Sequence, residues 1–376
     1  MSCEFRYGHA SRGRWQDAVA ACLSTIKPVP LGANLGFFYF NDRFIPHAAQ
    51  MLAALKRETG IESWVGSAGM GVIATGVEYM DQPAIAVMVG GFPERSFSVF
   101  SGRARPPVAG TRTASGAAAA HFAVVHGDPA TSDMADLIED MAGKLESGAM
   151  VGGLTSSRDE TAQIADVVLR GGLSGVVFSS DIGVVARITQ GCTPLVAPDG
   201  KPRIHRVTSA EDGGIQSLDG RPALDVFREC VGAEEAADLR RAVRTHLVGV
   251  VVPESGGSDY LVRNIVAVDA VTGSIGVGGG LREGDFVVLV RRDGEAARED
   301  LARMLGEMRT AIGGTPRAGL YFSCIARGSN LFGETGVEPH LIRDALGDFP
   351  MVGFFANGEI SQDRLYGYTG VLALFT

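Results

Sequence analysis

The chain has 376 residues, of which 45% are hydrophobic and 20% are charged, a composition typical of a globular protein with more than one domain. Its formal net charge of −9 argues against nucleic acids and anionic membranes as partners. No apolar run reaches the roughly 20 residues that a membrane-spanning helix needs. The five cysteines form no C-x-x-C motif, which is typical of reduced thiols. We therefore expect a cytoplasmic protein without a membrane anchor.

A unit of strand, helix, strand and strand occurs three times along the chain. In the first copy the strands are expected at 35–40, 64–69 and 84–89, with a helix at 46–59. In the second copy they are expected at 121–125, 150–156 and 174–178, with a helix at 133–145. In the third copy they are expected at 319–322, 351–354 and 370–374, with a helix at 338–346. The helices are predicted from apolar residues at period 3.6, and the strands from short apolar runs.

The second strand of each copy contains a Val-Gly pair at a similar distance from the first strand. The separation is 28, 28 and 31 residues, counted from Phe38 to Gly66, from Val124 to Gly152 and from Phe322 to Gly353. Chance apolar runs would not keep this order and spacing three times. The repeat therefore predicts a mixed α/β (α+β) fold with two related lobes, built from these units as mixed sheets covered by helices.

The segments between the copies predict a hairpin and a domain junction. Residues 204–208 and 215–218 alternate apolar and polar side chains around a glycine-containing turn, and a helix is expected after Arg221. The small and charged residues of 231–240 indicate a junction. We accordingly expect an N-terminal extension at 1–34, a first domain at 35–230 and a second domain at 231–376.

Familiar cofactor and metal signatures do not occur in the sequence. The run from Gly276 to Gly280 leads into another strand, so a β-turn is a better interpretation than a phosphate loop. The seven histidines never lie at i,i+2 or i,i+4 from one another. The serines form no G-x-S-x-G elbow, to which Val65–Gly69 comes nearest. We therefore expect neither a cofactor nor a metal site.

Chemically capable side chains gather in the third copy, near the ends of its strands. Cys324 ends an apolar strand, and Arg327 follows three residues later, where a guanidinium would favour the thiolate form. A buried structural thiol is an equally good interpretation of Cys324. Asn357 and Gly358 form a turn pair suited to positive φ, and Glu359 follows them. The first two copies lack this set of groups.

Several segments resemble the FIST family of sensory domains. They are Cys324-x-x-Arg-Gly328, the run from Phe349 to Ile360 with its Gly-Phe-Phe-x-x-Gly-Glu-Ile pattern, and Tyr368-Thr-Gly370. Residues 260–265 look like the opening of a C-terminal FIST domain, whereas 218–224 and the corner at 65–67 look like parts of an N-terminal one. The resemblance implies a FIST N-type and a FIST C-type domain that bind a small ligand, with amino acids as candidates.

Our leading hypothesis is a sensory protein that binds an amino acid or a similar polar metabolite and acts on an unknown signalling protein. Arg327 would hold the ligand's carboxylate and Glu359 its amine. The expected ligand-binding residues are Gly66, Ser67, Cys324, Arg327, Gly328, Gly353, Asn357, Gly358 and Glu359. No catalytic residue is assigned. Two alternatives stay open: a hydrolase or transferase with Cys324 as its nucleophile, and a docking scaffold that needs no ligand.

Overall fold

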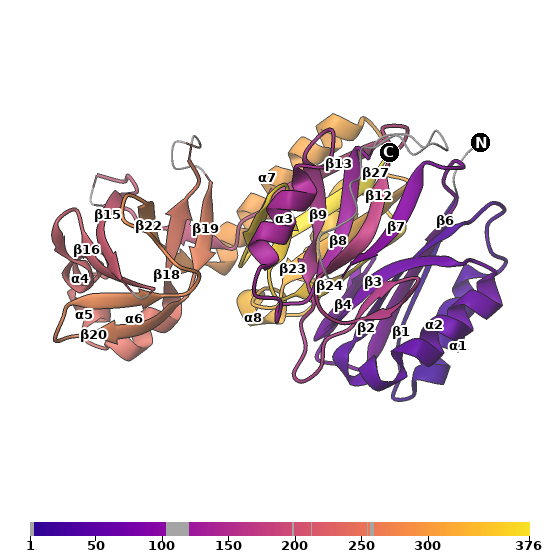
Figure 1. Cartoon of the computed structure of the whole chain (residues 1–376), viewed down its shortest axis with the longest axis horizontal. Coiled ribbons are helices and arrows are strands. Elements are labelled where there is room, and N and C mark those ends of the chain that lie inside the picture. Colours follow the sequence, from indigo (N-terminus) through magenta and orange to yellow (C-terminus); the bar gives the residue numbers. More distant parts are fainter. Residues whose placement is uncertain (1–3, 103–119, 198, 212, 254, 256–258) are drawn as a thin grey trace. The chain divides into compact units, whose positions relative to one another are not determined.

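The computed structural model describes residues 4–102, 120–197, 199–211, 213–253, 255 and 259–376. It forms two compact units, which are coloured along the sequence in Figure 1. The first unit combines Met1–Thr189 with Arg298–Thr376, and the second unit is Gln190–Ala297. Along the chain, the second unit is thus inserted into the first. The predicted α/β class is confirmed, because both units contain sheets and helices.

All three predicted repeats lie in the first unit. The first contains β2 (Leu35–Asn41), α2 (Ala48–Thr59), β3 (Ser63–Gly69) and β6 (Ala84–Gly90). The second contains β8 (Phe122–Gly127), α3 (Met134–Ala142), β9 (Ala149–Leu154) and β12 (Leu173–Phe178). The third contains β23 (Ala318–Cys324), α9 (Val337–Leu346), β24 (Met351–Ala356) and β27 (Gly370–Phe375). In every copy the first two strands are parallel and the third is antiparallel to the first, which confirms the predicted order of elements.

Each sheet is extended on one side by the strand that precedes its repeat and on the other by a hairpin from another repeat. The preceding strands are β1 (Phe5–Ser11), β7 (Phe97–Gly102) and β13 (Val184–Thr189). The hairpin β4–β5 (Gly71–Ala74 and Val77–Met80) joins the third sheet. The hairpin β10–β11 (Gln163–Ala165 and Val167–Leu169) joins the first sheet. The hairpin β25–β26 (Glu359–Ser361 and Arg364–Tyr366) joins the second, so the repeats exchange hairpins in a cycle.

The glycine of each Val-Gly pair lies where an exchanged hairpin meets its host sheet. On one side these glycines pair with the preceding parallel strand, Gly66 with Phe38, Gly152 with Val125 and Gly353 with Tyr321. On the other side each glycine pairs with an isoleucine of the exchanged hairpin, in the same order Ile164, Ile360 and Ile73. A Cβ atom at these glycines would lie 1.7 to 1.8 Å from the carbonyl oxygen of the facing residue. Glycine is therefore required for the parallel strands to approach this closely.

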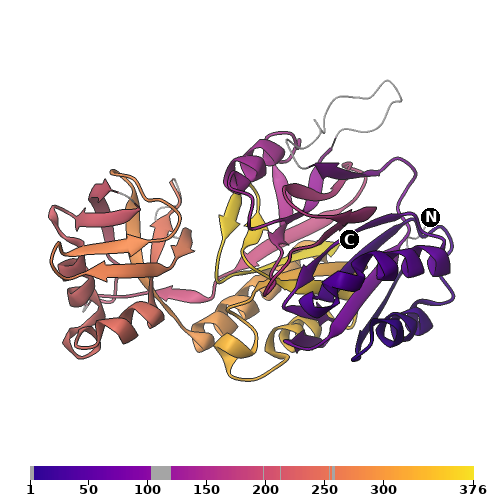
Figure 2. The same cartoon turned by 60° about the horizontal axis from the view of Figure 1, so that its bottom comes forward.

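One face of all three sheets packs into a shared core. Its side chains come from alternating strand positions, such as Leu35, Phe37 and Tyr39 of β2. Helices cover the opposite faces: α1 (Trp15–Ile26) and α2 the first sheet, α3 the second, and α7 (Gly294–Ile312) with α9 the third. Figures 1 and 2 show α1 and α2 next to each other on the first sheet. The predicted extension at 1–34 thus contains β1 and α1, a strand and a helix of the first sheet.

The second unit has a separate sheet with the strand order β19-β18-β22-β15-β16-β21-β20. These strands are β15 (Ile204–Glu211), β16 (Gly214–Leu218), β18 (His246–Val251), β19 (Tyr260–Arg263), β20 (Ile265–Asp269), β21 (Ser274–Val277) and β22 (Phe286–Arg292). Two short strands, β14 (Cys192–Pro194) and β17 (Arg221–Pro222), pair with β22 and β16. The helices are α4 (Ala223–Val231), α5 (Ala233–Ala236) and α6 (Leu239–Thr245), and α4 packs Leu224 and Phe227 into the unit's core.

The hairpin predicted at 204–218 and the helix predicted after Arg221 are thus confirmed. Residues 231–240, the expected junction, include α5 and lie within the second unit. The domain boundaries at 34 and 230 stay a prediction. Among the helices of the described residues, none has the length and apolar character that crossing a membrane requires.

Replacing Gly353 with alanine should strongly destabilise the first unit. The new Cβ atom would lie 1.7 Å from the Tyr321 carbonyl oxygen, so β23 and β24 would have to separate. We expect the free energy of unfolding, measured by urea denaturation, to fall by about 3 kcal/mol or more. Gly306→Ala is the control, because nothing lies within 4 Å of a Cβ atom there and alanine favours the helix α7. Equal stabilities of the two variants would contradict the close-approach argument.

Candidate functional site

The predicted site residue Arg327 lies in a buried polar cluster of the third repeat. Its Nε donates a hydrogen bond of 2.8 Å to Glu338 Oε1, and its Nη2 lies 2.7 Å from the same oxygen. Both side chains are fully buried. The hydroxyl groups of Tyr321 and Ser323 also donate to the Glu338 carboxylate, at 2.6 and 2.8 Å. The guanidinium expected to hold a ligand carboxylate is therefore already paired with a carboxylate of the protein.

Glu359 is also fully buried. Its Oε2 accepts hydrogen bonds from the amide and the hydroxyl of Thr369, at 3.1 and 2.8 Å. Burial raises the pKa of Glu359 to about 8, although the hydrogen bonds from Thr369, the charge of Arg327 and a hydrogen bond from Cys324 act in the opposite direction. The carboxyl group is therefore mostly protonated at neutral pH, which makes it a weak partner for the amine of a ligand.

Cys324 lies beside this carboxyl group and is buried, with 6% of its surface exposed. Burial and the charge of Glu359 raise the pKa of the Cys324 thiol, and the nearby Arg327 does not offset them. A protonated and buried thiol is a poor nucleophile. The alternative of an enzyme built on Cys324 thus loses its main physical support.

Of the remaining predicted residues, one lies in this cluster and the others lie at or near the places where exchanged hairpins pair with their host sheets. Gly328, with φ of +54°, adjoins Arg327, and a Cβ atom there would lie 2.8 Å from the Phe355 ring. Gly66 and Gly353 face carbonyl oxygens of neighbouring strands, as described above, and the buried Ser67 hydroxyl hydrogen-bonds Thr155 at 2.8 Å. The turn of Asn357 and Gly358 exchanges backbone hydrogen bonds of 2.9 Å with Leu154 at the end of β9. The structure thus groups Cys324, Arg327, Gly328 and Glu359, and their ligand-binding role stays a prediction.

Buried carboxylates also follow the first strands of the other two repeats. Asp42, after β2, accepts hydrogen bonds of 2.8 Å from Arg158 Nη1, in the loop that leads from β9 to the exchanged hairpin. Asp128, after β8, accepts hydrogen bonds from Thr161 at 2.6 Å and from the Gly171 amide at 2.8 Å. In all three repeats, hydrogen bonds to a buried carboxylate therefore hold a loop near the end of the first strand. This recurrence favours a structural role for the pair of Arg327 and Glu338.

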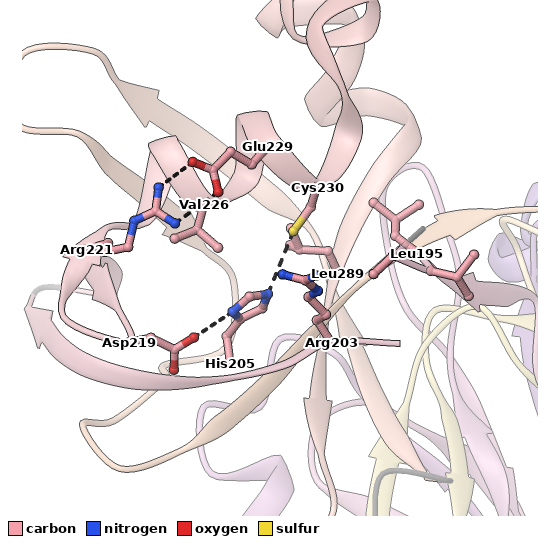
Figure 3. A pocket seen from close by; sticks show the side chains of 11 residues that line it. Leu195, Arg203, His205, Asp219, Arg221, Val226, Glu229, Cys230 and Leu289 are labelled. Atoms are coloured by element: carbon pink, nitrogen blue, oxygen red, sulfur yellow. Dashed lines mark hydrogen bonds and ion pairs between the residues drawn. The ribbon is translucent and has the colours of Figure 1, made fainter. Parts of the chain in front are cut away.

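A different candidate site, which the sequence analysis did not find, lies within the second unit. It is a pocket of about 560 Å³ next to α4, which contributes Val226, Glu229 and Cys230 from one face of the helix. Leu195 and Leu289 form an apolar wall. Figure 3 shows the polar side chains of the pocket, which come from α4, from β15 and the residue before it, from β17 and from the turn between β16 and β17.

A chain of three polar side chains crosses this pocket (Figure 3). His205 Nδ1 lies 2.7 Å from Asp219 Oδ2, and His205 Nε2 lies 3.7 Å from Cys230 Sγ. Burial acts to raise the pKa of Asp219, but the Arg206 amide, the hydrogen bond from His205 and nearby positive charges outweigh it and lower the pKa. An ionised carboxylate can only accept, so His205 donates from Nδ1, and in a neutral imidazole Nε2 is then an acceptor that faces the thiol.

The pocket also contains two arginines, and among the residues that the structure describes one of them is ion-paired and the other is not. Arg221 forms an exposed ion pair with Glu229 through both of its terminal nitrogens. The Arg203 side chain forms no hydrogen bond or ion pair within the described part of the chain, although its charge acts on Glu229 and Cys230. Arg203 is therefore the arginine of this pocket that is available to an anionic ligand.

The sequence contains only indirect signals for this pocket. His205 lies 14 residues before Asp219 and 25 residues before Cys230, and no compact motif joins them. Two local patterns could be recognised: the alternation of apolar and polar residues in the hairpin, and the spacing of residues on one face of the helix that follows it. The packing of that helix on the sheet, which brings Cys230 to His205 of β15, is a tertiary contact, so the three residues are associated only once the unit has folded.

The buried pair of the third repeat leads to a prediction about stability. Glu338→Gln leaves the buried guanidinium of Arg327 without its counter-charge, so the free energy of unfolding should fall by about 3–5 kcal/mol. Glu307→Gln is a matched control, because Glu307 pairs with Arg303 on the exposed side of α7 and its loss should cost about 0–1 kcal/mol. Urea denaturation of both variants measures the difference. A small effect of Glu338→Gln would show that Arg327 does not depend on this partner.

The raised pKa of Glu359 predicts how stability depends on pH. Between the ordinary value of 4.5 and about 8, the folded protein keeps a proton at Glu359 that the unfolded chain has released. This group therefore makes the free energy of unfolding decrease as the pH rises through that window, with no further change above it. Glu359→Gln should remove this contribution and flatten the profile measured by thermal or urea unfolding. An unchanged slope in the variant would contradict the prediction.

Comparisons with known proteins divide the chain differently, at a boundary near residue 222 that lies within the second unit. A FIST N domain model matches residues 34–221, and a FIST C domain model matches residues 223–362. The chain is 32% identical over 350 residues to the uncharacterized protein Rv0628c of Mycobacterium tuberculosis H37Rv, which covers 87% of each chain. It is 31% identical over 369 residues to the uncharacterized protein Mb0898c of Mycobacterium bovis, which covers 92% of this chain and 90% of that protein. FIST domains are associated with sensory signal transduction. The predicted resemblance is confirmed, and the chain belongs to the FIST family, with a FIST N domain followed by a FIST C domain.

Proposed function

We propose that this protein is a sensory protein that binds a small carboxylate, an amino acid or a similar polar metabolite, in the pocket of the second unit. The observation that carries the proposal is the Arg203 guanidinium, which lines a pocket of about 560 Å³ without an ion-pair partner among the described residues. Pockets of roughly this size, with apolar walls and a few polar groups, are typical of small-ligand sites.

The two kinds of side chain in the pocket match the two parts of such a ligand. Arg203 binds the carboxylate, because a guanidinium can donate two parallel hydrogen bonds to its oxygens. Leu195, Val226 and Leu289 contact the apolar part of the ligand. Asp219 and Glu229, which contact His205 and Arg221, also border the pocket and place carboxylate oxygens where an amino group could donate to them. An amino acid with an apolar side chain meets all three requirements.

The position of the pocket in the sequence supports a sensory role. Arg203, His205 and Asp219 belong to the segment that matches the FIST N domain, whereas Val226 and Cys230 belong to the segment that matches the FIST C domain. A ligand in this pocket would therefore contact both family segments. Signalling then requires that an output protein binds the occupied and the empty forms with different affinity.

The cluster predicted from the sequence is the second candidate site. It is supported by two buried carboxyl groups with raised pKa values, a feature that is common in functional sites. These are Glu359, described above, and Glu78 of the exchanged strand β5, whose pKa is raised to about 7 by burial and by the charge of Glu338, against the backbone amides of Gly336 and Ser329. The internal pairing of Arg327 makes this cluster the weaker candidate.

The proposal predicts which variant loses the ligand. A panel of amino acids and small carboxylates is tested by thermal shift, because a ligand that binds only the folded state raises the melting temperature. Arg203→Gln should weaken the binding of any hit by about 10- to 100-fold, since it removes a charged hydrogen-bond pair. Isothermal titration calorimetry measures this change.

Two controls separate the candidate sites. Arg309→Gln removes an exposed arginine of α7 in the first unit and should leave the affinity unchanged. Glu359→Gln should also leave it unchanged if the pocket of the second unit is the site. The proposal fails if no compound of the panel binds, or if Arg203→Gln binds as tightly as the original protein. A loss of binding in Glu359→Gln alone would move the site to the third repeat.

A further inference from the structure

We propose that the pocket of the second unit is chemically reactive, with Cys230 as a thiol nucleophile, His205 as its base and Asp219 as the residue that orients the imidazole. Its substrates would be activated esters or thioesters of small carboxylic acids. This inference rests on the proposed function, because it takes the same pocket as the site where the carboxylic compound binds. It adds a covalent step that a purely sensory pocket does not need.

The carboxylate, the imidazole and the thiol lie in the order that nucleophilic catalysis requires. Asp219 Oδ2 lies 2.7 Å from His205 Nδ1, on the far side of the ring from the thiol. His205 Nε2 faces Cys230 Sγ at 3.7 Å, within the distance of a hydrogen bond to sulfur. Figure 3 shows the carboxylate, the imidazole and the thiol in one row, bordering the pocket. A nucleophile, a base and an orienting group are thus present together.

Cys230 is also the most accessible of the described cysteines. Cys22, Cys192 and Cys324 are buried, whereas Cys230 is partly exposed and lines the pocket. It lies in the last turn of α4, one residue before the helix ends. A thiol in that position can be reached by a molecule in the pocket without opening the core of the unit.

The electrostatics indicate how the thiol would be activated. Burial raises the pKa of Cys230, the charge of Arg203 lowers it, and that of Glu229 raises it. Cys230 also lies near the negative end of the α4 dipole, which further disfavours a permanent thiolate. The proton therefore has to leave during the attack, which is the task of the imidazole. Arg203 supplies the positive charge opposite the oxyanion that then forms.

Besides the ester or thioester, the proposed reaction consumes only water. The Cys230 sulfur attacks the carbonyl carbon while its proton moves to His205 Nε2. The bond between the carbonyl carbon and the alcohol or thiol group then breaks, and the leaving group takes the proton from His205. This step leaves an acyl thioester on Cys230. Water hydrolyses the thioester with His205 again as the base, and the proton returns to the sulfur as the carboxylic acid is released.

The pH dependence of acylation distinguishes a base from a structural histidine. The charged or titratable groups that face His205 come from α4, from the residue before β15 and from the segment after β16: Arg203, Asp219, Arg221, Glu229 and Cys230. If His205 is the base, acylation rises as its imidazole loses its proton. In His205→Gln the rate should instead follow the ionisation of the thiol, at higher pH. A histidine that only stabilises the fold would not move the profile in this way.

The experiment measures acylation of the full-length protein by p-nitrophenyl acetate. Release of p-nitrophenolate gives the rate, and mass spectrometry of peptides locates the acetyl group. We expect one acetyl group on Cys230, a rate about 100-fold lower or more in His205→Gln, and at least about a tenfold loss in Asp219→Asn. Cys230→Ser should lose the thioester adduct. Cys22→Ala is the matched control, because this buried thiol of α1 lies outside both candidate sites, and it should react like the original protein.

The outcomes separate this inference from the proposed function. If Cys230 acquires no acetyl group, or acquires it equally fast in His205→Gln at every pH, the reactive triad is wrong. Binding of free carboxylates that depends on Arg203 would then still support the sensory pocket. If acylation at Cys230 depends on His205 but no free carboxylate binds, the reactive site stands and the proposed function falls. If Cys230 is not acylated and no free carboxylate binds, both the reactive triad and the proposed function are rejected.

Discussion

The close contact of three glycines with the carbonyl oxygens opposite them is the constraint on which the first unit depends. Gly66, Gly152 and Gly353 allow parallel strands to approach at the position where an exchanged hairpin pairs on the other side. Every six-stranded sheet of the described residues contains one such position. Because the inner faces of these sheets share a core, a displacement at one glycine would reach the other two repeats.

The two units differ in how they use charged side chains. In the first unit, carboxylates such as Asp42 and Glu338 are buried and paired with arginines of the same unit. Such pairs add specificity to the position of loops, and they leave few groups for a ligand. In the second unit, polar groups border an open pocket, and Arg203 faces it without an ion pair. The guanidinium proposed to bind a ligand is therefore one that no carboxylate of the described residues already pairs with.

The repeats could be predicted from the sequence because their signal is local, whereas the exchange of hairpins could not. Apolar runs and the Val-Gly pairs recur at similar spacing, but nothing near Ile73 indicates that it pairs with Gly353 rather than with its own repeat. The predicted site shows the same limit. The sequence places Arg327 next to Cys324, yet the partner that decides its role is Glu338, on another element 11 residues later. The pocket around His205 was missed because its residues approach one another only through the packing of α4 on the sheet.

The cyclic exchange of hairpins also determines when the first unit can form during synthesis. Thr75, next to β4, donates a hydrogen bond of 2.7 Å to the Phe349 carbonyl, 274 residues later in the chain. The third sheet, to which β4 and β5 belong, does not exist until β23 and β24 have left the ribosome. A nascent chain therefore carries this hairpin with unpaired edges while the whole second unit is translated. Such a topology implies slow, late folding, and it makes the growing chain a natural client of chaperones that shield exposed strands.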